Sequence, residues 1–133
     1  MFLNLEHLGL AVRDLPTATA LYTRLLGAEP YKTEHVESEA VDTVFFQVGG
    51  SKIELLAGTS PDSAVSKFLE KKPEGIHHVA FEVADIVAEM ARLRAEGFVL
   101  LNEHPKRGAD NKLVCFVHPK SAGGVLVELC QAI

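Results

Sequence analysis

The sequence of 133 residues lacks several features that would assign it to a functional class at once. It has only two cysteines, Cys115 and Cys130, and they do not show the CxxC spacing of a zinc cluster. Both fall in apolar strand patterns, so we expect reduced thiols in the core rather than a disulfide. No hydrophobic run approaches the length that crosses a bilayer, and we therefore expect no membrane association.

The chain also lacks an excess of positive charge, with 13 lysines and arginines against 18 acidic residues. The formal net charge is -5 and no dense lysine or arginine stripe is present, which argues against nucleic acid as a partner. The first strand pattern begins within about six residues of Met1, leaving no room for a secretory or transit segment, and this predicts a cytoplasmic protein. The sequence shows no nucleotide-binding glycine motif and no activated nucleophile, so neither redox nor covalent chemistry is indicated.

What the sequence does contain is a repeat. Residues 7–14, HLGLAVRD, return as residues 78–85, HVAFEVAD. A helical pattern of similar length follows each copy and ends at a glycine, as helices often do. Because a repeat of this length implies one supersecondary unit used twice, we predict two βαβββ modules. The helices expected after the two copies are Leu15–Leu26, closed by Gly27, and Ile86–Glu96, closed by Gly97.

The length of the chain suits one shared core rather than two independent ones. We therefore predict a single domain over residues 1–133, with modules of about 1–74 and 75–133. A short helix, Ser63–Lys71, is expected to connect them. The predicted strands are Leu5–Val12, Val41–Val48, Ser51–Leu56, His78–Val83, Leu113–His118 and Gly124–Cys130.

Two histidines and two glutamates occupy matching positions of the repeat. His7 and His78 each begin a copy, and Glu54 and Glu128 each lie in the middle of a closing strand. A mid-strand glutamate among valine, isoleucine and leucine is costly to bury without a partner, so each must face solvent or meet a cation. Imidazole and carboxylate groups together are typical ligands of a divalent metal. The sequence therefore predicts a metal site formed by these four side chains.

Other polar residues give weaker signals. Four histidines have no equivalent in the other module and are interpreted as non-ligands: His35, His77, His104 and His118. Lys106 and Lys120 lie in predicted loops. Each is either a solvated surface charge or a contact for phosphate groups, and the residues alone leave both readings open.

Four segments carry a resemblance to a known family: His7–Val12, Lys52–Leu56, Gly75–Phe81 and His118–Leu129. The chain resembles the vicinal-oxygen-chelate superfamily and, within it, the methylmalonyl-CoA epimerase family, over nearly its whole length. This resemblance implies a glyoxalase-like α+β fold, in which two βαβββ modules form a curved, partly open mixed sheet around a metal site. It also implies His7, Glu54, His78 and Glu128 as the metal ligands, the same four residues that the repeat indicates.

The activity implied by the resemblance is metal-dependent epimerisation at C2 of methylmalonyl-CoA, by proton removal and return through a metal-stabilised enolate. Glu128 is the first choice for the base and Glu54 the second, with Glu39 and Asp42 in reserve. One feature departs from the family: no glutamate stands in residues 41–46, where some epimerases have one. The resemblance further implies cobalt, an acyl-CoA substrate and a homodimer, and the ligand types also suit manganese, nickel or zinc.

Two other functions fit the same fold. A glyoxalase-like lyase acting on a glutathione hemithioacetal would use the same two-histidine, two-glutamate site. A non-catalytic small-molecule-binding protein would use the repeat only for its architecture.

Overall fold

A computed structural model describes all residues from Met1 to Ile133, and these form two compact units. The terminal unit contains both ends of the chain, Met1–His7 and His78–Ile133, and the central unit is Leu8–His77. Strands β1 (Phe2–Ala11) and β5 (Gly75–Val83) each pass from one unit into the other. The first seven residues, which precede the first predicted helix, thus group with the second copy of the repeat. That the chain is a single domain stays a prediction.

The central unit contains β2 (Lys32–Val36), β3 (Val41–Val48) and β4 (Ser51–Gly58) in the strand order β2-β3-β4-β1, and β3 pairs antiparallel with both β2 and β4. Its hairpin between β3 and β4 turns at Gly49, whose φ of 58° favours glycine, as the Gly49-Gly50 pair predicts. Helix α1 ends at Gly27 with a left-handed φ of 68°, which confirms the predicted C-cap. The other elements are α1 (Leu15–Leu26), the 3-10 turn η1 (Glu37–Glu39) and α2 (Ala64–Lys71).

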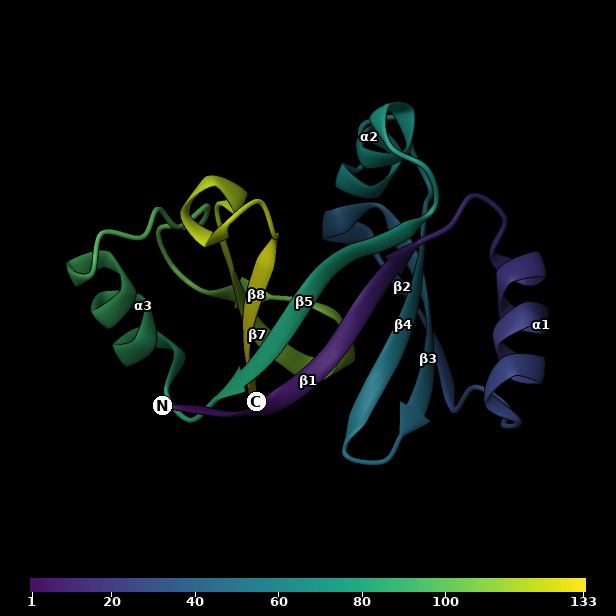
Figure 1. Cartoon of the computed structure of the whole chain (residues 1–133), viewed down its shortest axis with the longest axis horizontal. Coiled ribbons are helices and arrows are strands. Elements are labelled where there is room, and N and C mark those ends of the chain that lie inside the picture. Colours follow the sequence, from purple (N-terminus) through teal and green to yellow (C-terminus); the bar gives the residue numbers. More distant parts are fainter. The chain divides into compact units, whose positions relative to one another are not determined.

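The core of the central unit lies between α1 and strands β3 and β4 (Figure 1). Phe46 of β3 and Leu55 of β4 are fully enclosed, and Ala18 and Tyr22 of α1 pack against the same cluster. Alternation along β4 explains this, because Ile53 and Leu55 point to the helix-covered face while Glu54 points to the other.

The terminal unit has strand order β1-β5-β8-β7-β6. Strands β5 and β8 pair in parallel, whereas β7 pairs antiparallel with both β8 and β6. Besides β1 and β5, the elements are α3 (Ile86–Ala95), β6 (Lys106–Arg107), η2 (Ala109–Asn111), β7 (Lys112–Val117), η3 (Pro119–Ala122) and β8 (Val127–Ala132).

Helix α3 covers β7 and β8 in the terminal unit (Figure 1). Ile86, Met90 and Leu93 recur at helical spacing and bury one face of α3 against Cys115 and Leu129. Both cysteines of the chain are free and buried, as predicted: Cys115 in this cluster, Cys130 in a neighbouring one.

The element order confirms the α+β class and the two βαβββ modules, with α2 as the connector. The predicted strands left out β2, and residues 104–112, which contain the two-residue β6, were expected to form a loop or hairpin. The sequence also placed the start of the last strand at Gly124, but β8 begins at Val127. Gly123 and Gly124 both adopt positive φ after the turn η3, so they end a turn and do not extend a strand. No helix has the length and apolar character needed to span a membrane.

Candidate functional site

Three of the predicted ligands converge in the terminal unit, and we call His7, His78 and Glu128 the triad. The two Nε2 atoms of His7 and His78 lie 3.0 Å apart. Glu128 Oε1 is 3.2 Å from Nε2 of His78 and 3.8 Å from Nε2 of His7. All three side chains are buried, with at most 8% of each exposed. Two imidazole nitrogens and one carboxylate oxygen therefore lie within 3.8 Å of one another.

The strand pairing explains this convergence. His7 lies on β1 and His78 on β5, which are neighbouring strands, and Glu128 lies on β8, the next strand along. Glu128 is in register with Ala80 of β5, two residues beyond His78 and therefore on the same face. Since Ala80 has a small side chain, it leaves room for the carboxylate to reach the imidazoles.

The donor set fits a divalent metal ion. Ligand atoms bonded at about 2.1 Å to one ion and adjacent in an octahedron are separated by about 3.0 Å. Two of the three separations within the triad, 3.0 and 3.2 Å, match that spacing, and the third is 3.8 Å. Imidazole nitrogen and carboxylate oxygen are borderline ligands that suit first-row transition metals. The three ligand atoms lie within 4.8 Å of one another, so a single ion can be reached by all of them.

Glu128 is held in its charged form. Burial, the largest effect, raises the pKa of this carboxyl group. The hydrogen bond with His78 and the electrostatic interactions with His78 and His7 outweigh it, so the pKa is lowered from its ordinary value, with the nearby Glu6 opposing them. An ionised carboxylate accepts a proton or binds a cation, which are the two roles predicted for this residue.

A further residue beside the triad, Glu6, was not predicted from the sequence. Glu6 is buried, and its Oε1 lies 3.0 Å from Nδ1 of His7, the ring nitrogen that points away from the triad. Its other oxygen lies 3.9 Å from Nζ of Lys112. Consecutive residues of a strand point to opposite faces, so alternation alone gives no signal of a contact between Glu6 and His7. A carboxylate directly before a predicted ligand histidine was the available signal.

The ring of Phe116 forms one wall next to the triad. It lies edge-on to the His78 ring, with centroids 5.9 Å apart, and the His7 and His78 rings are also edge-on at 5.1 Å. Phe116 is in register with Glu128 on the neighbouring strand. These contacts restrict the rotation of both imidazoles and therefore help to fix the directions of their Nε2 atoms.

The other predicted acidic residues belong to the central unit. Glu54 is buried on β4, in register with Phe45. Glu39 ends η1, and Asp42 lies on β3, where it accepts a hydrogen bond from His35. The structure thus gathers three of the four predicted ligands in one unit, and the part of Glu54 in the site stays a prediction.

The two lysines and the remaining histidines lie outside the triad. Lys120 is exposed and Lys106 half-buried on β6. Nδ1 of His118 accepts a hydrogen bond from the backbone N–H of Lys120, which gives this histidine a capping role at η3. His77 packs its ring against Phe68 at 5.0 Å.

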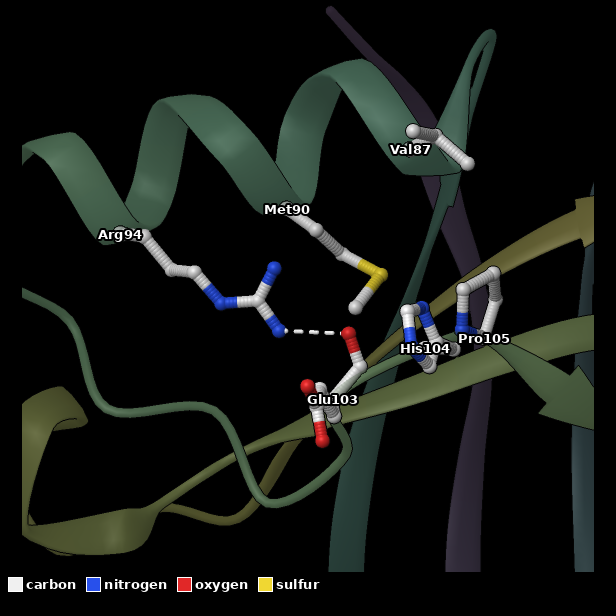
Figure 2. Close-up of a pocket in the computed structure, with 6 residues that line it drawn as sticks. All are labelled: Val87, Met90, Arg94, Glu103, His104 and Pro105. Atoms are coloured by element: carbon white, nitrogen blue, oxygen red, sulfur yellow. Dashed lines mark hydrogen bonds between the residues drawn. The ribbon is translucent and has the colours of Figure 1, made fainter.

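A hollow of about 370 Å³ lies elsewhere in the terminal unit, beside α3 (Figure 2). Figure 2 shows Arg94 reaching from the helix to donate a hydrogen bond of 2.8 Å to the backbone oxygen of Glu103. None of its lining residues belongs to the triad: Val87, Met90, Arg94, Glu103, His104 and Pro105.

Comparison with known proteins gives consistent matches. Residues 6–116 match the family model described as Glyoxalase/Bleomycin resistance protein/Dioxygenase superfamily. The chain is 43% identical over 130 residues to the ethylmalonyl-CoA/methylmalonyl-CoA epimerase of Cereibacter sphaeroides, covering 96% of this chain and 97% of the relative. It is 42% identical to the human mitochondrial methylmalonyl-CoA epimerase, covering 97% of this chain and 74% of that protein. An uncharacterised Bacillus subtilis protein is 38% identical, with 96% and 91% covered.

Solved structures agree with these relatives. A variant of Streptomyces coelicolor methylmalonyl-CoA epimerase in complex with 2-nitronate-propionyl-CoA is 36% identical, with a TM-score of 0.95 and 99% of both chains covered. A methylmalonyl-CoA epimerase in complex with methylmalonyl-CoA and an ammonium ion has the same identity and TM-score, with 99% of this chain and 96% of that chain covered. The resemblance found in the sequence is thereby confirmed.

Proposed function

This chain belongs to the Glyoxalase/Bleomycin resistance protein/Dioxygenase superfamily, and we propose that it epimerises methylmalonyl-CoA at C2. The observation that carries the proposal is the match over nearly its full length to named epimerases, at about 40% identity. A similar protein holds methylmalonyl-CoA itself in its solved structure. Epimerisation removes the proton from C2 and returns one to the opposite face, so it needs groups that accept and donate a proton there.

The triad would hold a divalent metal ion, with Glu54 as the predicted fourth ligand. Such an ion acts as a Lewis acid that stabilises negative charge on substrate oxygens. The family resemblance favours cobalt, and the same ligands also accept manganese, nickel or zinc. The buried positions of His7, His78 and Glu128 support this assignment, because they exclude bulk water from the charges that they bring together.

Glu128 is the proposed base at C2. Its lowered pKa keeps it ionised at neutral pH, so it starts the reaction able to accept a proton. We propose Glu54 for the second proton transfer, as its counterpart in the repeat, with Glu39 and Asp42 as the next choices. Each of the three is an acidic residue of the central unit, and the repeat singles out Glu54 among them.

Coenzyme A carries anionic phosphates, so cationic side chains near the bound substrate would contribute to its binding. Lys120 and Lys106 are the proposed contacts. The exposed position of Lys120 and its place at η3, a turn next to the start of β8, support its assignment.

We also propose a cytoplasmic homodimer. Exposed apolar side chains near the start of β1, Phe2, Leu3 and Leu5, support the dimer because apolar surface is often covered by a partner. Sedimentation that shows only a monomer at micromolar concentration would contradict it.

The experiment that tests the function measures deuterium uptake at C2 of methylmalonyl-CoA in D2O by mass spectrometry. Metal-loaded protein should exchange the C2 proton rapidly, and Glu128→Gln should lose the exchange because an amide cannot act as a base at neutral pH. Glu70→Gln, on the exposed surface of α2, serves as the matched control and should keep it.

The alternatives predict different results. With methylglyoxal and glutathione, a glyoxalase-like lyase gives a product and an epimerase gives none. With a non-catalytic binding protein of this fold, C2 of methylmalonyl-CoA takes up no deuterium and the protein binds no metal. If metal-loaded wild-type protein does not exchange the C2 proton, the epimerase proposal is overturned. The lyase test is then the next experiment.

A further inference from the structure

Glu6 lies outside the triad and contacts the second ring nitrogen of His7, Nδ1. Its Oε1 lies 3.0 Å from Nδ1 of His7, while Nε2 of the same ring faces the triad. An ionised carboxylate only accepts hydrogen bonds, so the proton of this contact belongs to Nδ1 of His7. A neutral imidazole protonated at Nδ1 presents its lone pair at Nε2, the form that binds a metal.

The contacts on the other side of the ring require the same arrangement. The Nε2 atoms of His7 and His78 are 3.0 Å apart, so one of them donates and the other accepts. Nε2 of His78 also contacts Glu128 Oε1 at 3.2 Å, so in the metal-free chain His78 carries a proton on Nε2, which a bound metal would displace, and Nε2 of His7 is the acceptor. With its proton at Nδ1, His7 satisfies both contacts, whereas the other tautomer would leave Glu6 without a donor from His7.

We propose that Glu6 is a positioning residue, which fixes His7 in the Nδ1-protonated tautomer and so prepares Nε2 for the metal. It acts through His7 and does not touch the substrate. Nζ of Lys112 lies 3.9 Å from the other oxygen of Glu6, and this contact helps to hold the carboxylate in place. The inference rests on the proposed function, since the metal site belongs to it.

The structure also explains why a glutamate reaches this atom. Glu6 and His7 are consecutive on β1, both within the terminal unit, and both are buried. A buried carboxylate without a charged or donor partner is strongly destabilising. Glu6 has two such partners, on β1 itself and on β7, so the strand that carries the ligand also carries the group that orients it.

The first test is spectroscopic and uses the metal-free full chain. In 15N–1H spectra of the histidine rings, His7 should carry its proton on Nδ1 in the wild type. Glu6→Ala should shift His7 toward the Nε2-protonated tautomer. Glu6→Gln should keep the wild-type tautomer, because the amide oxygen still accepts from Nδ1. His7 protonated on Nε2 in the wild type would overturn the inference.

The second test measures affinity for Co²⁺ alone, by competition with a chelator. Glu6→Ala should bind it about 10- to 100-fold more weakly, the usual effect of losing a carboxylate behind a ligand histidine. Glu6→Gln should lose less than about 10-fold. The matched control is Glu82→Gln, an acidic side chain of β5 that contacts Asn4 of β1 away from the triad, and it should bind as the wild type does.

The two proposals fail in different ways. Unchanged Co²⁺ affinity in a folded Glu6→Ala, with tight binding by the wild type, overturns the role of Glu6 and leaves the metal site standing. Wild-type protein that binds no Co²⁺ overturns the metal site of the proposed function, and the tautomer spectra then decide whether Glu6 orients His7. Should Glu6→Ala not fold, Glu6→Asp replaces it. Its shorter side chain should draw the carboxylate away from Nδ1 and weaken binding more than Glu6→Gln does.

Discussion

The terminal and central units share one local pattern, a strand, a helix and further strands with a helix-covered core, yet they use their polar residues differently. The terminal unit gathers two histidines and a glutamate at a buried point. In the central unit, the cluster of His35, Glu37 and Asp42 is exposed, and its contacts link β2, η1 and β3.

The difference shows that the two copies of the repeat do not coincide with the two compact units of the structure. His7 belongs to the first copy of the repeat but packs in the terminal unit, because β1 enters it and runs beside β5. The two histidines of the repeat therefore meet within one unit, while the two glutamates, on β4 and β8, are divided between the units. Four equivalent residues thus have unequal surroundings.

The largest expected effect comes from breaking the triad. His78→Ala removes one imidazole and should weaken Co²⁺ binding by more than about 100-fold, beyond the loss expected for an outer residue. His77→Ala, one position earlier and packed against Phe68, should bind the metal as the wild type does. Equilibrium dialysis with metal analysis compares them. Equal losses in both variants would mean that the triad is not the metal site.

A pair of equivalent leucines tests whether the two cores matter equally. Leu55 and Leu129 directly follow Glu54 and Glu128, and neither is exposed at all. Substitution of either by alanine should lower the free energy of unfolding by about 2–5 kcal/mol, because it leaves a cavity. Urea denaturation measures this, with the exposed Leu25→Ala as a control that should change stability by less than about 0.5 kcal/mol. A small effect at only one leucine would show that the cores contribute unequally.

The repeated aspartates provide a smaller contrast. Asp85 accepts a hydrogen bond of 3.1 Å from the backbone N–H of Ala88 and caps α3, whereas Asp14 at the start of α1 contacts the hydroxyl of Thr17 instead of a backbone N–H. Asp85→Ala should therefore cost about 1 kcal/mol of stability, and Asp14→Ala less. Thermal unfolding followed by circular dichroism compares the two. A larger cost at Asp14 would contradict this explanation.

The smallest expected effect is the pH dependence of the exposed cluster. Hydrogen bonds with Glu37, and then Asp42, raise the pKa of His35 above its ordinary 6.5. Protonated His35 therefore stabilises the folded chain fully below pH 6.5, and this contribution is lost as the pH rises through the raised value. In an NMR titration, Glu37→Gln should lower the pKa of His35 more than Asp42→Asn. The reverse order would contradict the assignment.

Much of the fold could be predicted from local patterns. The range Leu15–Leu26 and its cap at Gly27 follow from helical spacing and a left-handed glycine, and both are confirmed. The missed strand β2 has a mixed sequence, KTEHV, and half-exposed positions, so its pairing with β3 and not its own pattern makes it a strand. Strand β6, with two residues, is too short to give any pattern.

The sequence by itself determined the two modules and predicted His7, His78, Glu54 and Glu128 as metal ligands, because strand and helix periods and a repeat are local properties of the chain. Only the tertiary structure decided that His7, His78 and Glu128 share one unit and that Glu6 contacts the far nitrogen of His7. The reason is physical: which strands become neighbours depends on long-range pairing, and the direction of a side chain depends on the groups packed around it.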